Sequence, residues 1–214
     1  MARLASRQSP VAPLAGLRRA LVAIGLLAVL APAASSAAGS AADPAAFIAG
    51  FVQRGADIAA ASPTLDDAAL EPWRRLVNEG LDLPRIAAFV VGVPWKGATD
   101  GERSELVRLI GGQIAALYAR RVAADRDAAL KITGSQDLGP EEALVASRLT
   151  RRDGTVESID WLVRGRAASG FGIVDIVSDG QSLAAQKRSE YAMLLQRSRG
   201  DIAGLIEALR LGRP

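Results

Sequence analysis

The 214-residue sequence contains no histidine and no cysteine. Histidine is the usual general base near neutral pH and the commonest zinc ligand, so its absence removes most schemes for hydrolases, proteases and transition-metal enzymes. The absence of cysteine excludes disulfide bonds, so the hydrophobic core alone must hold the fold together. We therefore expect no metal and no cofactor, and the composition counts against most classes of enzyme.

Aromatic residues are also scarce, with four Phe, three Trp and two Tyr in the whole chain. Hydrophobic residues nevertheless make up 50% of the sequence, so most of the core must be aliphatic. Any cavity inside such a core would have soft walls and would discriminate little between ligands of different length.

The first 42 residues differ from the rest of the chain. They contain basic residues but no acidic ones, followed by the apolar run 20–30 and then by small residues. This order is typical of a secretory signal peptide, and 11 apolar residues are too few for a membrane-spanning helix, which needs about 20. We predict that residues 1–42 comprise a signal peptide and a flexible mature N-terminus, with cleavage after Ala37, Ala38, Ala41 or Ala42.

The net charge of +3 comes mostly from this leader. Removing its four arginines from the 26 basic residues leaves 22 against 23 acidic residues, a net charge of −1. A nucleic-acid-binding domain needs a basic face. We therefore expect no nucleic acid as a partner.

Hydrophobic periodicity divides the rest of the chain near Asp127. Before this residue the apolar positions recur at helical spacing, and after it the period is two. We predict helices over 43–61, from 66 or 67 to 80, over 82–91, and from 99 or 100 to about 122. We then predict strands over 128–138, 143–151, 156–164 and 171–177, with an Asp153-Gly154 hairpin turn, and closing helices over 182–197 and 201–211. Helices segregated from an antiparallel meander make an α+β fold.

Two pairs of residues each have two interpretations. Gly111 and Gly112 lie inside the longest predicted helix, where each glycine costs roughly 1 kcal/mol relative to alanine. They either open room for a ligand or allow close packing of helices, and we favour packing. Trp161 is expected to fill the core, whereas Trp95 could fill the core or gate a cavity.

Two segments of the chain resemble a known protein family. One covers residues 171–210 and joins a strand to two amphipathic helices through a turn, with Asp175, Gly180, Ser182, Tyr191, Leu194, Leu195 and Gly200 in this order. We interpret Asp175, Gly180 and Ser182 as structural residues of that turn. The other segment has Gly92, Trp95 and Lys96 before Ala98, Thr99, Glu102 and Arg103. Together they resemble the MlaC family of periplasmic phospholipid-binding proteins, also called toluene-tolerance auxiliary proteins.

The resemblance implies that residues 43–214 form an MlaC-like lipid-binding domain. Its sheet would be curved, with about four antiparallel strands, and helices would pack on it around an elongated apolar cavity. The cavity would hold the tails of a phospholipid, or of a related amphiphile such as a hopanoid, between the sheet and the long helix. We predict that it is lined by Phe89, Val93, Trp95, Leu106, Ile110, Ile114, Leu117, Ile132, Leu144, Ile159, Trp161, Val163, Ile176 and Leu183. For contact with the headgroup or with a partner we predict the arginines Arg148, Arg151, Arg152, Arg164 and Arg166.

The same resemblance implies a role in lipid transport and in outer-membrane lipid asymmetry. The protein would be a periplasmic monomer that carries lipid between an MCE-domain ABC transporter complex at the inner membrane and an outer-membrane lipoprotein complex. It would have no catalytic residues.

Two other functions remain open from the sequence. The first is an envelope adaptor with a filled core, which binds protein partners and no lipid. The second is a cone-shaped α+β enzyme, for which Asp160 is the acid to test. Carboxylate pairs such as residues 66–67 and 141–142 are better explained as helix starts or solvated turns than as acid-base pairs.

Overall fold

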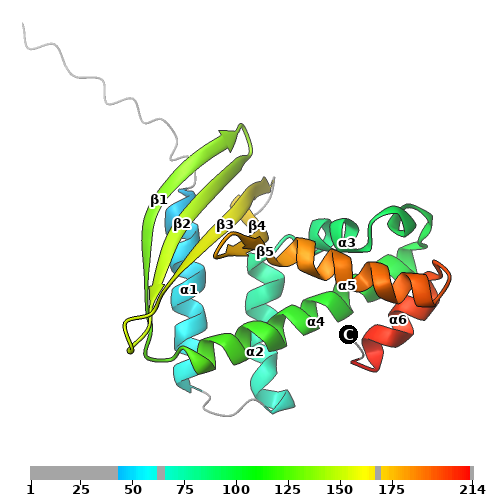
Figure 1. Ribbon diagram of the computed structural model, residues 1–214, viewed down its shortest axis with the longest axis horizontal. Helices are drawn as coiled ribbons and strands as arrows, with labels where there is room; N and C mark the ends of the chain where they lie inside the picture. The colour runs from blue at the N-terminus through cyan, green and yellow to red at the C-terminus, as the bar shows by residue number, and fades with distance from the viewer. Residues whose placement is uncertain (1–42, 62–65, 167–169, 213–214) are drawn as a thin grey trace, which may run out of the picture. The chain divides into compact units, whose positions relative to one another are not determined.

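The computed structural model describes residues 43–61, 66–166 and 170–212 (Figure 1). The predicted signal peptide and its four candidate cleavage positions lie outside these residues, so this interpretation stays a prediction. The helices are α1 (Pro44–Ala61), α2 (Asp67–Gly80), α3 (Leu83–Val91), the 3-10 helix η1 (Val93–Gly97), α4 (Asp100–Ala124), α5 (Leu183–Arg197) and α6 (Ile202–Arg210). Each predicted helix is therefore confirmed, and its predicted ends differ from the observed ends by at most two residues.

Side-chain caps explain where these helices begin. Asp66 accepts a hydrogen bond from the backbone of Ala69 at 2.8 Å and caps α2. Thr99 and Glu102 form a reciprocal capping box at the start of α4, with the Thr99 backbone N–H donating to Glu102 at 2.8 Å. Such caps satisfy backbone N–H groups that have no partner in the first turn of a helix.

The strands form one antiparallel sheet in sequence order: β1 (Ala129–Gly139), β2 (Glu142–Thr150), β3 (Val156–Arg166), β4 (Gly170–Ser178) and β5 (Gln181–Ser182). The first four confirm the predicted meander, and the α+β fold with a curved sheet is confirmed with them (Figure 1). The two-residue strand β5 was not predicted. A segment this short has no periodicity from which a strand could be recognised.

The turn between β2 and β3 differs in one detail from the expected two-residue type. Arg151 donates its backbone N–H to the carbonyl of Thr155 at 2.9 Å, so three residues form the turn. Only Gly154 has a positive φ, of 86°, whereas the expected turn would also need a positive φ at Asp153. The structure is therefore closer to the three-residue hairpin loop that ends with a glycine.

Helix α1 covers one face of the sheet, and the space between them is filled by side chains. Phe51 of α1 lies edge-on to Trp161 of β3, with ring centroids 6.1 Å apart. The Trp161 indole N–H donates to the hydroxyl of Ser147 at 3.0 Å, and Ser147 donates to the carbonyl of Ile159 at 2.7 Å. Trp161 is 2% exposed, as expected for a residue of the core.

The two glycines inside α4 have different surroundings. A methyl group added at Gly111 would come within 2.8 Å of a Leu83 methyl on α3, whereas one added at Gly112 would meet no atom within 4 Å. Close packing of α3 on α4 therefore accounts for Gly111 but not for Gly112.

This difference predicts opposite effects of two alanine substitutions. Gly112→Ala should raise the free energy of unfolding by up to about 1 kcal/mol, because alanine is the better helix former. Gly111→Ala should be at least about 1 kcal/mol less stable than Gly112→Ala, because Leu83 must shift. Urea unfolding of both variants measures the difference, and equal stabilities would show that Leu83 adapts without cost.

Candidate ligand-binding cavity

A cavity of about 670 Å³ lies between α4 and α5. Its wall is predominantly aliphatic, and polar side chains lie among the aliphatic ones on α4 and α5. The residues of the wall are Leu81, Ile86, Val90, Ile110, Gln113, Ile114, Ala116, Leu117, Arg120, Ile173, Asp175, Ile176, Leu183, Ala184, Gln186, Lys187, Glu190, Tyr191, Leu194, Leu209 and Gly212.

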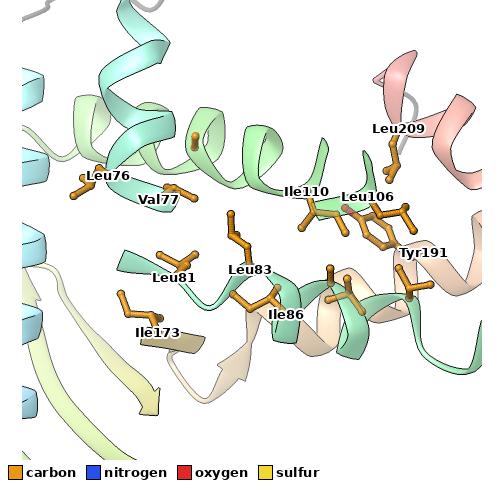
Figure 2. Close-up of a cluster of buried hydrophobic side chains, with 14 of the residues drawn as sticks. Leu76, Val77, Leu81, Leu83, Ile86, Leu106, Ile110, Ile173, Tyr191 and Leu209 are labelled. Atoms are coloured by element: carbon orange, nitrogen blue, oxygen red, sulfur yellow. The ribbon is translucent and has the colours of Figure 1, made fainter. Parts of the chain in front are cut away.

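The helices build this wall from apolar positions at helical spacing. On α4, Ile110, Ile114 and Leu117 follow one another on a single face. Helix α3 supplies Ile86 and Val90 to the same cavity. Figure 2 shows Ile86 on α3 lying between Leu81 and the side chains gathered around Tyr191.

Strand β4 and helix α6 line the two ends of the cavity. At one end Ile173 of β4 lies beside Leu81, and the backbone N–H of Asp82 donates to the Ile173 carbonyl at 2.9 Å. At the other end Leu209 of α6 approaches Tyr191 and Ile110 (Figure 2). The cavity thus runs along the space between α4 and α5.

One hydrogen bond spans the cavity. The Tyr191 hydroxyl donates to the side-chain oxygen of Gln113 at 2.9 Å and so joins α5 to α4. Burial raises the pKa of Tyr191, and the charge of Glu190 raises it further, so the phenol stays protonated and can donate at any physiological pH.

The wall carries four charged side chains, and three of them have partners. Lys187 pairs with Glu190 at 2.5 Å. Asp175 accepts from the Ser182 hydroxyl at 2.5 Å and from the backbone N–H groups of Ile176 at 2.8 Å and Ala184 at 3.0 Å. Asp175 thus holds the turn before α5 in place.

The fourth charged side chain is Arg120 near the end of α4. It is exposed and forms no hydrogen bond or ion pair within residues 43–61, 66–166 and 170–212. The cavity therefore combines a long apolar wall with a single arginine that is available to a ligand.

The sequence model of the MlaC protein family matches residues 57–211 of the chain. The chain belongs to the MlaC family. Among solved structures, a phospholipid-binding protein from Ralstonia solanacearum, determined in complex with a phospholipid, superposes with a TM-score of 0.67 at 20% sequence identity. The match covers 79% of this chain and 96% of the Ralstonia protein.

No curated protein matches this MlaC-family chain. Within the described residues, none of the helices combines the length and the apolar character needed to cross a bilayer.

The cavity of this MlaC-family protein contains some of the predicted lining residues. Five of the fourteen lie in its wall: Ile110, Ile114, Leu117, Ile176 and Leu183. Three others are buried in the core outside the wall: Leu106, Trp161 and Val163. Four are partly buried and also lie outside it: Trp95, Ile132, Leu144 and Ile159. The contact of all fourteen residues with lipid stays a prediction.

The remaining two predicted residues lie on the surface. Phe89 is 45% exposed and Val93 is 79% exposed. The guanidinium of Arg188 lies 5.0 Å from the centre of the Phe89 ring and donates to the Phe89 carbonyl at 2.7 Å. Trp95 similarly lies 5.8 Å below Arg103.

The position of the cavity explains this distribution. We expected the tails between the sheet and the long helix, but none of the described residues of β2 or β3 lies in the wall. Helix α1 covers the face of these strands. The sheet contributes to the wall only through residues of β4, at one end.

Most of the predicted headgroup arginines are engaged with carboxylates. Arg151 pairs with Asp125 at 2.6 Å and with Glu157, Arg152 pairs with Asp127 at 3.4 Å, and Arg164 pairs with Glu142 at 2.8 Å. Arg148 is exposed on β2 without an ion pair to any described residue. The Arg166 side chain lies outside the described part of the structure. None of the other four lies in the wall of the cavity, and the contact of all five arginines with a headgroup stays a prediction.

Arg120 and Gln113 were missed by sequence reasoning. A signal was nevertheless present, because Arg120 follows Leu117 by three residues and so continues the apolar face of Ile110, Ile114 and Leu117. A charged residue in line with an apolar stripe indicates that the stripe ends at water.

Proposed function

We propose that this protein binds phospholipid in the cavity between α4 and α5 and carries it across the periplasm. The tails lie along the apolar wall, and the headgroup stays at the opening. The observation that carries this proposal is the cavity itself, about 670 Å³ in volume and lined mainly by aliphatic side chains. Membership of the MlaC family and the phospholipid bound to the Ralstonia protein support it.

The size of the cavity is suited to acyl chains. Ligand pockets in proteins commonly measure about 300–1,000 Å³. If a methylene group takes about the volume of a water molecule in the liquid, about 30 Å³, then 670 Å³ accommodates about 22 methylene groups. Transfer of these groups from water would be favourable by about 18 kcal/mol, at about 0.8 kcal/mol each.

The transfer energy of the tails does not by itself set the direction of transport. A tail that leaves a bilayer for the cavity exchanges one apolar environment for another, so loading and unloading are close to balanced. The membrane partners therefore determine the direction of transfer. The proposed partners are an MCE-domain ABC transporter complex at the inner membrane and an outer-membrane lipoprotein complex.

The proposed chemistry is binding and transfer without catalysis. Within the described residues, no cluster of three His, Cys, Asp or Glu side chains is suited to hold a metal ion. Asp160, the candidate acid for an enzyme, lies on β3 outside the cavity wall.

Native mass spectrometry of the protein purified from its host tests the proposal. We expect one lipid per folded chain, identified after extraction as a phospholipid or a hopanoid. A folded monomer that never retains a lipid would instead support the adaptor function. Extraction from an unrelated periplasmic protein of the same preparation measures the background.

A further inference from the structure

The charged side chains of the cavity wall differ in whether they have hydrogen-bond or ion-pair partners. Lys187 is neutralised by Glu190 at 2.5 Å. Asp175 accepts three hydrogen bonds at the start of α5, where the positive end of the helix dipole also stabilises its charge. Arg120 alone has no partner among the described residues. An arginine in this state offers all its N–H groups to a ligand.

Arg120 lies at the boundary between the apolar wall and water. It is three residues beyond Leu117 on α4, and both side chains lie in the wall and are exposed. Arginine places its aliphatic stem along apolar surface and keeps its charged head in water. The guanidinium is therefore positioned where the polar part of an amphiphile would emerge if its tail lay along Ile114 and Leu117.

Lys187 stands on the facing helix, α5, in the same wall. Its pairing with Glu190 is only partly buried, with 37% of the Lys187 side chain exposed. Ion pairs of this exposure contribute little energy, about 0–1 kcal/mol, so Lys187 can turn toward an incoming anion at small cost.

From this arrangement we propose that Arg120 binds the phosphate group of the lipid at the opening of the cavity, with Lys187 contributing from the opposite side. The inference rests on the proposed function, since it assigns a polar contact to the lipid that the cavity holds. A guanidinium matches phosphate well, because two of its N–H groups can donate to two phosphate oxygens at once. The protein thereby selects phosphate-bearing lipids over neutral diacyl lipids of the same tail length.

Competition between two lipids tests this selectivity. The delipidated full-length mature protein is incubated with vesicles that contain phosphatidylglycerol and diacylglycerol with identical tails, and the bound lipids are quantified by mass spectrometry. We expect wild-type protein to favour phosphatidylglycerol and Arg120→Gln to lower the bound ratio of phosphatidylglycerol to diacylglycerol by about tenfold. The ratio does not depend on the fraction of protein that is folded.

Two further variants sharpen the result. Arg120→Lys keeps the charge but loses the two-pronged donor, so its ratio should fall between those of wild type and Arg120→Gln. Arg75→Gln is the matched control, because Arg75 is an exposed helical arginine on α2 outside the cavity wall. Its ratio should equal that of wild type.

The outcomes separate the inference from the proposed function. If wild type and Arg120→Gln bind phosphatidylglycerol with the same ratio, the inference is wrong and the carrier function stands. If neither lipid binds to any variant, the proposed function fails. If an excess of inorganic phosphate lowers the wild-type ratio toward that of Arg120→Gln, free phosphate competes with the headgroup for Arg120, which supports the inference.

Discussion

Ala184→Trp is expected to abolish lipid retention, with bound lipid falling below about a tenth of the wild-type level. Ala184 lies in the wall of the cavity near the start of α5. A tryptophan side chain there would occupy space that the tail needs. Overpacking of this kind typically costs about 1–3 kcal/mol of stability, which a folded domain can tolerate.

Ala192→Trp is the matched control. It introduces the same side chain on the same helix, but Ala192 is exposed and lies outside the cavity wall. Lipid bound per folded chain is measured by native mass spectrometry, and thermal unfolding checks both variants. Full retention of lipid by a folded Ala184→Trp protein would place the ligand elsewhere and would overturn the proposed binding site.

The fold could be predicted from the sequence because its signals are local. Asp66, Asp82 and Thr99 mark helix starts, since each cap contacts a residue three positions further along. The change in hydrophobic period near Asp127, from helical spacing to two, is also a local signal and separates the helices from the strands. These features need no knowledge of which element lies beside which, and β5 was missed because two residues give no such pattern.

The candidate site was harder to predict because it depends on where the elements lie in space. Ile110 and Leu106 are both apolar residues of α4, and no local pattern tells that Ile110 lines the cavity while Leu106 is buried outside it. Likewise Trp161 and Ile176 lie opposite each other on neighbouring strands, and only Ile176 lies in the wall. The apolar residues that line the cavity are those that face the space between α4 and α5, and this space is set by how the helices pack.

The sequence also could not show which arginines lack an acidic partner. Arg151 and Arg120 are both arginines in segments that are otherwise apolar or mixed. Only the structure places Arg151 beside Glu157 across the hairpin and beside Asp125, which is 26 residues away in the sequence. It leaves Arg120 without such a partner among the described residues.

The ion-pair cluster around Glu157 fixes the end of α4 next to Arg120. Glu157 on β3 is 5% exposed and bonds to Arg121 of α4 and to Arg151 after β2, and it accepts from the Ser178 hydroxyl at 2.5 Å. Arg121 also pairs with Asp125 at 3.1 Å. The cluster therefore links α4 to β3, to β4 and to the residue that follows β2, within one turn of the proposed phosphate contact.

Glu157→Gln should lower the free energy of unfolding at neutral pH by about 2 kcal/mol. The loss is smaller than for a fully buried pair, because Arg121 is half exposed and Arg151 keeps its contact with Asp125. Urea unfolding measures the change. Glu71→Gln is the control: it removes an exposed ion pair with Arg74 and should lower the free energy of unfolding by less than about 1 kcal/mol.

The difference between wild type and Glu157→Gln should depend on pH. Burial acts to raise the pKa of Glu157, but hydrogen bonds from Ser178 and Arg151 and the charges of both arginines outweigh it and lower the pKa below its usual value. The pKa of Asp125 is lowered mainly by its hydrogen bond to Arg151. A carboxylate with a lowered pKa stabilises the folded state above its unfolded pKa of about 4, and this contribution is lost as the pH falls through the folded pKa.

Wild type should therefore lose stability steeply as the pH falls from about 5 to about 3, and Glu157→Gln should lose less, so that the two unfolding curves converge in acid. Because the cluster anchors α4, Glu157→Gln should also weaken selection for phosphatidylglycerol by moving Arg120. A gap in stability that stayed constant across this pH range would show that Glu157 acts through packing rather than through its charge.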